Sequence, residues 1–367
     1  MNVVFIQKHA GRGGSKSSLA ESLSALTADG SITPRVISAE QGPFTARCGA
    51  LGVPVDIAPL PEWRKFMERI RFPGAMKSIA GSLASARPDW IISNEMWWGP
   101  HAARIARHLG CRSAVILRDG IATIPKAKQY RLWENDLILP VSSTIADALR
   151  PDPLFHDRVH VLFNSVSIAA PRADAEENLS AMLSAYPAVG RWLLVVGKLS
   201  PRKNQVDAVR ITRSLIDSGH PDLGLLLAGD IDPAYLPEME QTIATSGMQD
   251  RVALIGNFDG VATLLEKAYS VILPSFREGL PRSLVEAITA GVPAFSYPCE
   301  GVEDIFEEHL PVFVSGESTP ESLSAVIRRA WECPERCSAE FAAVRHRVIR
   351  KFSPEAHSRN LRALLSA

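Results

Sequence analysis

The sequence predicts two α/β domains of the Rossmann type, facing each other across a cleft. Three observations indicate this fold class: a length of 367 residues, a regular alternation of short apolar runs with longer helical stretches, and a polar interruption between two such series. A chain of this length holds roughly two domains of about 150 residues each. Strands that alternate with helices are typical of doubly wound parallel sheets, which bind ligands beyond the carboxyl ends of their strands.

The first series of elements occupies the N-terminal half of the chain. Its apolar runs have the length of buried parallel strands, and patterned helices such as Ser17–Thr27 and Pro100–Leu109 separate them. The expected strands are Val3–Ile6, Thr33–Ser38, Trp90–Ser93, Ala114–Leu117, Leu137–Val141 and a final short one at His160–Phe163.

A polar stretch rich in Ala and Glu, Ala169–Glu177, is interpreted as the linker to a second series. We place the domains at residues 1–168 and 188–352, the linker region at 169–187 and a separate helix at 353–367. The expected strands of the second series are Trp192–Val196, Gly224–Ala228, Arg251–Ile255, Ser270–Leu273 and Val292–Ser296. Its expected helices are Asn204–Ser218, Val261–Ala268, Pro281–Ala290 and Pro320–Cys333.

The composition is that of a globular protein and argues against several functions. Forty basic and forty acidic residues give a formal net charge of zero, which disfavours binding of nucleic acid through the overall charge. No window approaches the roughly 18 apolar residues of a membrane span, and the run Val3–Ile6 lacks the cleavage region of a signal peptide. The five cysteines are scattered and odd in number, so we expect no disulfide framework and no metal site, and a cytoplasmic location.

The segment Ser275–Glu286 combines the end of a strand, a loop and the start of a helix. Pro281 suits the first turn of that helix. The backbone from Gly279 through Leu280 to Arg282 therefore offers N–H groups at a helix N-terminus, a place suited to phosphate.

Two glutamates flank this turn. Glu278 lies in the loop, where it can accept hydrogen bonds from sugar hydroxyls. Glu286 lies about one turn into the helix, where it can accept from both hydroxyls of a ribose. The alternative is that both glutamates are solvated, with Glu286 paired to Arg282 four residues earlier.

The order Pro-Ser-x-x-Glu278-Gly-Leu-Pro, then Glu286 after seven intervening residues, then Ala-x-x-Ala-Gly-Val-Pro293, resembles the E-x7-E signature of family-4 retaining glycosyltransferases of the GT-B fold. The resemblance implies two Rossmann-like domains, with the helix at 353–367 crossing back to the first. It also implies that Glu278 contacts the donor sugar and Glu286 the nucleotide ribose. The donor, a nucleoside-diphosphate sugar of the UDP or GDP type, is then a substrate, and neither cofactor nor metal is implied.

The segment Val196-Gly-Lys-Leu-Ser-Pro-Arg-Lys-Asn204 is similar to a second family element, Gly-Arg-Leu-x-x-x-Lys-Gly. Lys198 stands for the usual Arg, Lys203 matches the usual Lys, and Asn204 replaces the Gly. The resemblance implies that Lys198 and Lys203 stabilise the charge of the departing nucleoside diphosphate. Arg202 either shares this work or is solvated.

Three further residues are assigned by comparison with the family. Asn257 and Phe258 follow a strand of the second domain and are expected near the nucleotide base. Arg118 follows a strand of the first domain, where many relatives have a histidine that faces the donor sugar. It either contacts a phosphate or an anionic acceptor, or forms a salt bridge with Asp119 or Glu95.

The first strand is followed by a glycine-rich stretch that opens a helix. Gly13 and Gly14 match the glycine pair that lets the backbone of relatives approach the donor phosphate or the acceptor. The rival interpretation is a P-loop, which Lys16-Ser17 fits, while Ala10 and Ser15 stand where glycines belong.

The segment 61–72 has the pattern of an amphipathic helix. Trp63, Phe66, Met67 and Ile70 share one face, and basic residues line the rest. Such a helix suits peripheral contact with an anionic membrane. The alternative is a helix that packs on the core with its charged face in water.

We therefore predict a retaining, metal-independent glycosyltransferase that transfers a sugar to an acceptor hydroxyl in polysaccharide, glycolipid or other glycoconjugate synthesis. The acceptor is a saccharide or a lipid-linked molecule. Asp230-Ile-Asp232 is not expected to hold a metal, because Asp-x-Asp sites belong to the GT-A fold. The alternatives are a GT-B phosphorylase, a nucleotide-sugar-binding protein without activity and, third, a P-loop ATPase. The donor sugar, the base and the oligomeric state stay open.

Overall fold

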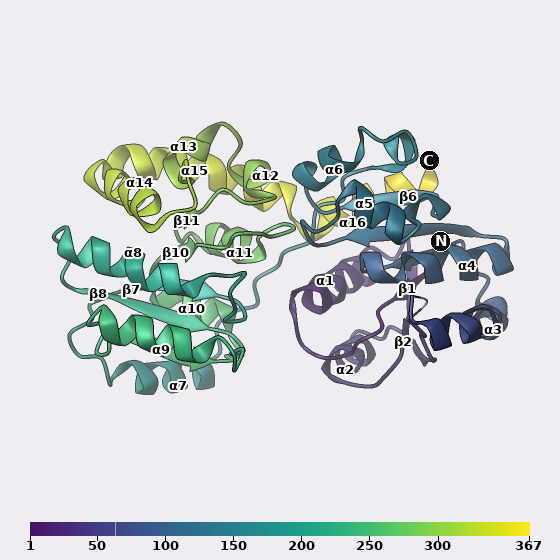
Figure 1. The fold of residues 1–367 in the computed structure, drawn as a ribbon, viewed down its shortest axis with the longest axis horizontal. Helices are drawn as coiled ribbons and strands as arrows, with labels where there is room; N and C mark the ends of the chain where they lie inside the picture. The colour runs from purple at the N-terminus through teal and green to yellow at the C-terminus, as the bar shows by residue number, and fades with distance from the viewer. Residues whose placement is uncertain (63) are drawn as a thin grey trace. The chain divides into compact units, whose positions relative to one another are not determined.

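The computed structural model describes residues 1–62 and 64–367, except for the side chains of Phe66, Met67 and Arg69. The chain forms two compact units (Figure 1). Unit 1 comprises Met1–Val166 together with Lys351–Ala367, and unit 2 comprises Ser167–Arg350. Each unit contains a parallel sheet flanked by helices, which confirms the predicted pair of Rossmann-like domains.

The sheet of unit 1 has six strands: β1 (Asn2–Ile6), β2 (Thr33–Ser38), β3 (Val55–Ile57), β4 (Trp90–Ser93), β5 (Arg112–Leu117) and β6 (Leu137–Pro140). They lie in the order β3-β2-β1-β4-β5-β6, and every pair is parallel. The strands other than β3 are largely buried apolar runs, as expected of a sheet that is covered on both faces. The strand order reverses between β1 and β4, so the switch point where such folds bind ligands lies at their carboxyl ends.

The helices of unit 1 are α1 (Gly14–Asp29), α2 (Pro43–Ala50), α3 (Phe66–Leu83), α4 (Gly99–Leu109), α5 (Ile124–Gln129), α6 (Ser143–Leu149) and α16 (Pro354–Ser366). Apolar side chains of β1, α3 and α4 share one core cluster. α16 packs on α1, and Trp90 Nε1 donates a hydrogen bond to the carbonyl oxygen of Leu365 at 3.1 Å. The C-terminal helix therefore belongs to unit 1, as the resemblance implies (Figure 1, yellow).

The sheet of unit 2 has five parallel strands: β7 (Arg191–Val196), β8 (Leu223–Ala228), β9 (Val252–Gly256), β10 (Ala268–Leu273) and β11 (Ala294–Ser296). Their order is β11-β10-β7-β8-β9, so the switch point lies between β10 and β7. The helices are α7 (Ala173–Leu183), α8 (Gln205–Asp217), α9 (Leu236–Thr245), α10 (Val261–Lys267), α11 (Arg282–Ala290), α12 (Val302–Phe306), α13 (Leu310–Phe313), α14 (Pro320–Glu332) and α15 (Pro334–Lys351). The chain returns to unit 1 at the end of α15.

Several elements differ from the sequence-based expectation, which did not name the helices α9, α12, α13 and α15. The stretch expected as a linker contains α7, which packs on α10 and buries Ala175 and Leu179, so its polar composition conceals an apolar face. The segment His160–Phe163 is not a strand: its backbone runs beside β6 with two N–H···O bonds, to Ile138 and Pro140, but without a continuous ladder. Strand β3 was not expected, because it is short and partly exposed at the sheet edge.

The expected amphipathic segment 61–72 is only partly described. Trp63 lies outside the described residues, as do the side chains of Phe66 and Met67. Ile70 is 67% exposed, whereas Phe72 is buried. The rings of Phe72 and His101 meet edge to face, with their centroids 4.8 Å apart. Contact of this segment with a membrane stays a prediction. Among the described residues, no helix combines the length and the apolar content that crossing a bilayer requires.

Candidate functional site

A buried ion pair lies at the carboxyl ends of two neighbouring strands of unit 2. Lys203 follows β7 and Glu278 follows β10, the strands between which the order reverses. Lys203 Nζ lies 2.5 Å from Glu278 Oε1, and the two side chains are 16% and 8% exposed. Removing one partner of a largely buried pair leaves the other charge with poorer compensation. The structure thus brings together two of the predicted site residues at the place where this fold class binds ligands.

Two glycines shape the loops after β7 and β8 beside the ion pair. Gly197 and Gly229 have φ angles of +146° and +149°, in a region that side chains rarely tolerate. A Cβ atom on Gly229 would lie 2.2 Å from the carbonyl oxygen of Gly197, so the loops after β7 and β8 touch through bare backbone. A Cβ atom on Gly197 would lie 3.5 Å from Cε of Lys203. The lysine chain therefore lies across Gly197 on its way to Glu278.

Arg202 ties the loop after β7 to the loop that carries Glu278. Its Nη1 donates to the carbonyl oxygen of Arg277 at 2.6 Å and lies 3.5 Å from Glu278 Oε2. In return, the N–H of Phe276 donates to the carbonyl oxygen of Arg202 at 3.1 Å. The guanidinium is thus a second cation beside Glu278 and not a freely solvated side chain.

Lys198 lies apart from this ion pair. Its side chain is 58% exposed, and its Nζ lies 3.5 Å from Asp232 Oδ2. Its carbonyl oxygen accepts a hydrogen bond from Gln205 Nε2 at 3.1 Å, which fixes the backbone of the loop. The structure therefore pairs this predicted site residue with the second carboxylate of the Asp-x-Asp motif.

The predicted phosphate turn precedes α11. Gly279, Leu280 and Pro281 are buried, and α11 begins at Arg282. Glu286 Oε1 lies 2.9 Å from Arg282 Nη2, with both side chains largely buried. The i, i+4 pair that the sequence raised as an alternative is thus present, and it holds Glu286 close to the start of the helix.

Four residues that the sequence analysis did not select as site residues surround the Lys203–Glu278 pair. The N–H of Glu278 donates to Glu300 Oε2 at 2.9 Å, and a buried network joins Asn204, Asp207 and Tyr297 beside Lys203. Tyr297 and Glu300 lie in the loop that follows β11, whose carboxyl end lies at the same sheet edge as those of β7 and β10. That position after a parallel strand is the signal that could have identified them.

Asn257 and Phe258 follow β9, the edge strand that lies two strands away from β7. Asn257 is exposed and Phe258 is partly buried. The ring of Phe258 lies beside Gly260, where a Cβ atom would meet its Cε1 at 3.3 Å. The two residues thus lie at the edge of the sheet, and their predicted contact with a base stays a prediction.

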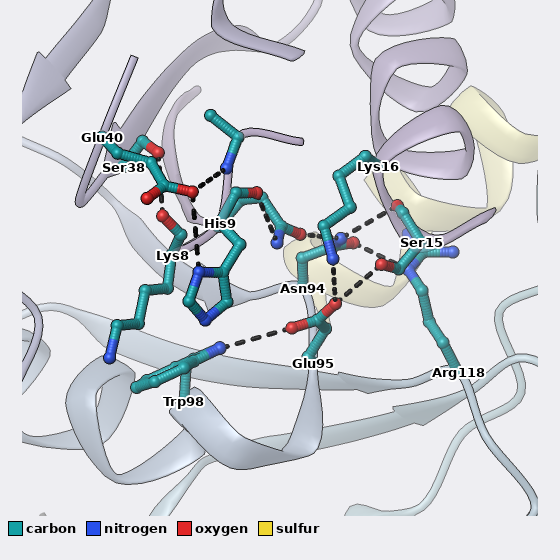
Figure 2. A network of polar contacts seen from close by, with 12 residues as sticks. Lys8, His9, Ser15, Lys16, Ser38, Glu40, Asn94, Glu95, Trp98 and Arg118 are labelled. Atoms are coloured by element: carbon teal, nitrogen blue, oxygen red, sulfur yellow. Dashed lines mark hydrogen bonds and ion pairs between the residues drawn. The ribbon is translucent and has the colours of Figure 1, made fainter. Parts of the chain in front are cut away.

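A separate polar cluster lies at the switch point of unit 1, at the ends of β1 and β4 (Figure 2). Glu95 Oε1 accepts hydrogen bonds from the hydroxyl of Ser15 at 2.7 Å and from Lys16 Nζ at 3.2 Å. Its Oε2 accepts from Trp98 Nε1 at 3.3 Å. The carboxylate therefore clamps the first turn of α1 onto the end of β4.

Asn94 extends this cluster into the core of unit 1. Its amide nitrogen donates to Gln7 Oε1 at 2.6 Å and to the carbonyl oxygen of Ser15 at 3.1 Å. Its Oδ1 accepts from Arg118 Nε at 2.7 Å (Figure 2). Arg118 also donates to the side chain of Asn164. The guanidinium is thus held by two amide oxygens, a partner type that the sequence analysis did not consider.

The glycine-rich turn of unit 1 precedes α1 directly. Gly13 has a φ angle of +140°, and Cβ atoms on Gly11, Gly13 or Gly14 would meet nothing within 4 Å. Space therefore borders the turn on the side of these glycines. Lys16 Nζ lies 3.2 Å from Glu95 Oε1, so this lysine is paired with a carboxylate, as Lys203 is in unit 2.

Comparison with known proteins bears on unit 2 most directly. Residues 188–343 match the family described as "Glycosyl transferases group 1". A curated relative, 2-deoxystreptamine glucosyltransferase of Streptomyces kanamyceticus, is 27% identical over 159 residues, which are 43% of this chain and 40% of that protein. The Vi polysaccharide biosynthesis protein VipC/TviE of Salmonella typhi is 32% identical over 111 residues, 30% of this chain and 19% of that protein. The matches thus span less than half the length of these relatives.

The whole chain is similar in fold to solved structures. HepE of Anabaena, crystallised in complex with UDP and glucose, aligns with a TM-score of 0.81 at 16% identity and covers 100% of this chain and 99% of its own. This likeness and the two parallel sheets show the GT-B fold, with its two Rossmann-like domains.

Proposed function

We propose that this chain is a retaining, metal-independent glycosyltransferase that moves a sugar from a nucleoside-diphosphate sugar to an acceptor hydroxyl. The observation that carries the proposal is the buried pair of Lys203 and Glu278, which lies at the switch point of unit 2 within the segment that matches the glycosyl transferase family. Support for the donor class comes from the UDP bound by the structurally similar HepE.

In this proposal, different residues of unit 2 bind different parts of the donor. Lys203, with Lys198 on the exposed side, compensates the charge that develops on the departing diphosphate. Glu278 accepts hydrogen bonds from the sugar hydroxyls, and Glu286 from the ribose hydroxyls. The backbone N–H groups at the start of α11 face the phosphates.

The reaction breaks the bond between the anomeric carbon and the phosphate oxygen and forms a bond from that carbon to the acceptor oxygen on the same face of the sugar. The acceptor proton passes to the leaving phosphate, so the nucleoside diphosphate itself is the base. The acceptor is a saccharide or lipid-linked hydroxyl compound. The likeness to a polysaccharide biosynthesis protein supports a place in polysaccharide or other glycoconjugate synthesis.

The test begins with a thermal-shift screen of the full chain against UDP, GDP and their sugars, because a ligand that binds the folded state raises Tm. The donor found is then offered with saccharide acceptors. Glu278→Ala should lower transfer at least about tenfold, on the order of 1.4 kcal/mol of transition-state stabilisation, while binding of the nucleotide persists. Near-normal transfer in this variant would overturn the role of Glu278. Phosphorolysis without a nucleotide, or binding without any transfer, would point to a phosphorylase or to an inactive binding protein.

A further inference from the structure

The loop that follows β11 contacts the surroundings of both members of the Lys203–Glu278 pair. We propose that residues 297–301, named here the 297–301 segment, position this pair, with Tyr297 acting on the lysine and Glu300 on the glutamate. The inference rests on the proposed function, since it assigns positioning residues to the reaction proposed above.

The 297–301 segment is firmly attached at both ends. The N–H of Tyr297 donates to the carbonyl oxygen of Leu273, the last residue of β10, at 3.0 Å. Its carbonyl oxygen accepts from the hydroxyl of Ser296 at 2.7 Å. At the other end, Gly301 has a φ angle of +84°, and a Cβ atom there would lie 2.9 Å from the carbonyl oxygen of Gly279. The segment therefore lies against the end of β10 on one side and against the turn before α11 on the other.

Tyr297 reaches the lysine through a buried carboxylate. The phenol, which is fully buried, donates to Asp207 Oδ2 at 3.0 Å. The same oxygen accepts from the side-chain amide of Asn204 at 2.6 Å. Asn204 is the neighbour of Lys203 and has a φ angle of +52°, a left-handed conformation that costs free energy in any residue except glycine. The hydrogen bond to Asp207 thus holds the backbone turn that directs Lys203 toward Glu278.

Glu300 reaches the glutamate through the backbone. Its Oε2 accepts the N–H of Glu278 at 2.9 Å, a charge-assisted hydrogen bond at the point where the loop turns toward Lys203. One five-residue segment therefore fixes the backbone at both charged groups, so that their 2.5 Å separation is set before a donor binds.

The contacts from Tyr297 through Asp207 and Asn204 to Lys203 are named here the lysine arm. They are tested with Asn204→Gly and Tyr297→Phe in the full chain. Glycine tolerates the left-handed turn but lacks the amide, and phenylalanine lacks only the hydroxyl. Each should lower kcat about tenfold with the donor KM within about twofold, and the double variant should lose no more than the larger single, because both act through Asp207. Thr212→Val is the matched control: it removes another buried hydroxyl bond of α8, to the carbonyl oxygen of Ala208 at 2.8 Å. The lysine arm would be refuted if Thr212→Val lowered kcat as much as Asn204→Gly and Tyr297→Phe do. It would also be refuted if the losses of kcat in the two single variants added up in the double variant.

The hydrogen bond from the N–H of Glu278 to Glu300 is named here the glutamate arm. It is tested by comparing Glu300→Ala with Glu300→Gln. Glutamine keeps an oxygen that can accept the N–H of Glu278, so it should restore most of the kcat that alanine loses. Equal loss in both variants would show that the negative charge, and not the hydrogen bond, matters, and would refute this arm.

A second readout separates the inference from the proposed function. Lysines labelled with 13C at Cε and 15N at Nζ are observed by NMR without donor, and the Lys203 signal is identified by its loss in Lys203→Arg. Tyr297→Phe and Asn204→Gly should shift this signal in the direction that Glu278→Gln shifts it, whereas Thr212→Val should leave it in place. Failure of the wild type to transfer any sugar would refute the proposed function alone. A Lys203 signal unchanged in both lysine-arm variants would refute the positioning.

Discussion

Lys16 and Glu95 form an ion pair in unit 1, with Nζ 3.2 Å from Oε1 and both side chains less than one-fifth exposed. Burial acts to raise the pKa of Glu95, but Lys16 and the hydrogen bonds from Ser15 and Trp98 hold it below its ordinary value. The pair joins the first turn of α1 to the end of β4. What opposes the P-loop interpretation is the sequence, in which Ala10 and Ser15 stand where the glycines belong.

We expect Glu95→Gln to lower the free energy of unfolding by about 2 kcal/mol at neutral pH, the order of a hydrogen-bonded, partly buried charge. Because the folded-state pKa is depressed, the contribution is complete above the unfolded-state value and is lost as the pH falls through the folded-state value. The difference between wild type and variant should therefore shrink in acid, as measured by urea denaturation at several pH values. A difference that stays constant down to strongly acidic pH would contradict this account.

Lys203→Met should destabilise the protein by about 2 kcal/mol, because the buried Glu278 then keeps Arg202, at 3.5 Å, as its remaining cation among the described residues. Adding Glu278→Gln removes that charge, so the double variant should regain most of the lost stability and none of the lost transfer. Chemical denaturation and a transfer assay on the same three samples check this. Recovery of transfer in the double variant would show that the pair is only structural.

Lys198→Ala should change stability by no more than about 0.5 kcal/mol, because the lysine is exposed and its contact with Asp232 is weak. If Lys198 binds the diphosphate, the donor KM should rise about tenfold, as expected for a charged hydrogen bond. Asp232→Asn is the control, since it frees Lys198 without removing it and should not raise KM. An unchanged KM in Lys198→Ala would exclude this lysine from the donor site.

Glu286→Gln tests the ribose assignment. A carboxylate that accepts from two hydroxyls discriminates UDP from 2′-deoxy-UDP, and the amide should lose most of that discrimination. Competition binding with the two nucleotides measures the ratio for each protein. The Arg282–Glu286 pair offers a purely structural explanation, under which the variant would lose stability and keep the wild-type ratio.

Most of the architecture could be predicted because both sheets consist of apolar runs buried on both faces. Two of the elements that escaped prediction have little apolar surface of their own. Strand β3 has three residues at an edge, and α7 buries only Ala175 and Leu179 within a polar sequence. In such elements tertiary packing determines the secondary structure, and no periodicity in the local sequence predicts that structure.

The candidate site shows a similar division. Lys203 and Glu278 belong to motifs with a fixed order along the chain, and the structure brings them together. Lys198 has the matching residue type, yet its side chain pairs with Asp232. Asn204 and Glu300 could not be ranked from sequence, because their contacts with Asp207 and Glu278 matter only where the loops after β7, β10 and β11 meet. Lys203 and Glu278, which these loops bring together, are 75 residues apart in the chain.

His357 of α16 makes the attachment of the C-terminal helix sensitive to acid. Its ring nitrogen Nδ1 donates to the carbonyl oxygen of Phe163 at 2.8 Å, and its Nε2 is buried and finds no hydrogen-bond partner among the described residues. Burial lowers its pKa to about 4, since a proton on Nε2 would add an uncompensated charge inside unit 1. The unfolded chain binds that proton near pH 6.5, so stability is complete above this value and falls as the pH drops toward 4, by about 3 kcal/mol in total.

We therefore expect His357→Gln to flatten the acid side of the stability curve between pH 6.5 and about 4. Glutamine keeps a donor for the carbonyl oxygen of Phe163 but has no proton to gain in this range. His101 is the internal comparison, because burial lowers its pKa to about 4 as well, so the single variant should remove only part of the pH dependence and His101→Gln a further part. Thermal unfolding of the three proteins across this range measures the effect. An acid limb as steep in His357→Gln as in the wild type would show that α16 does not depend on the neutral imidazole.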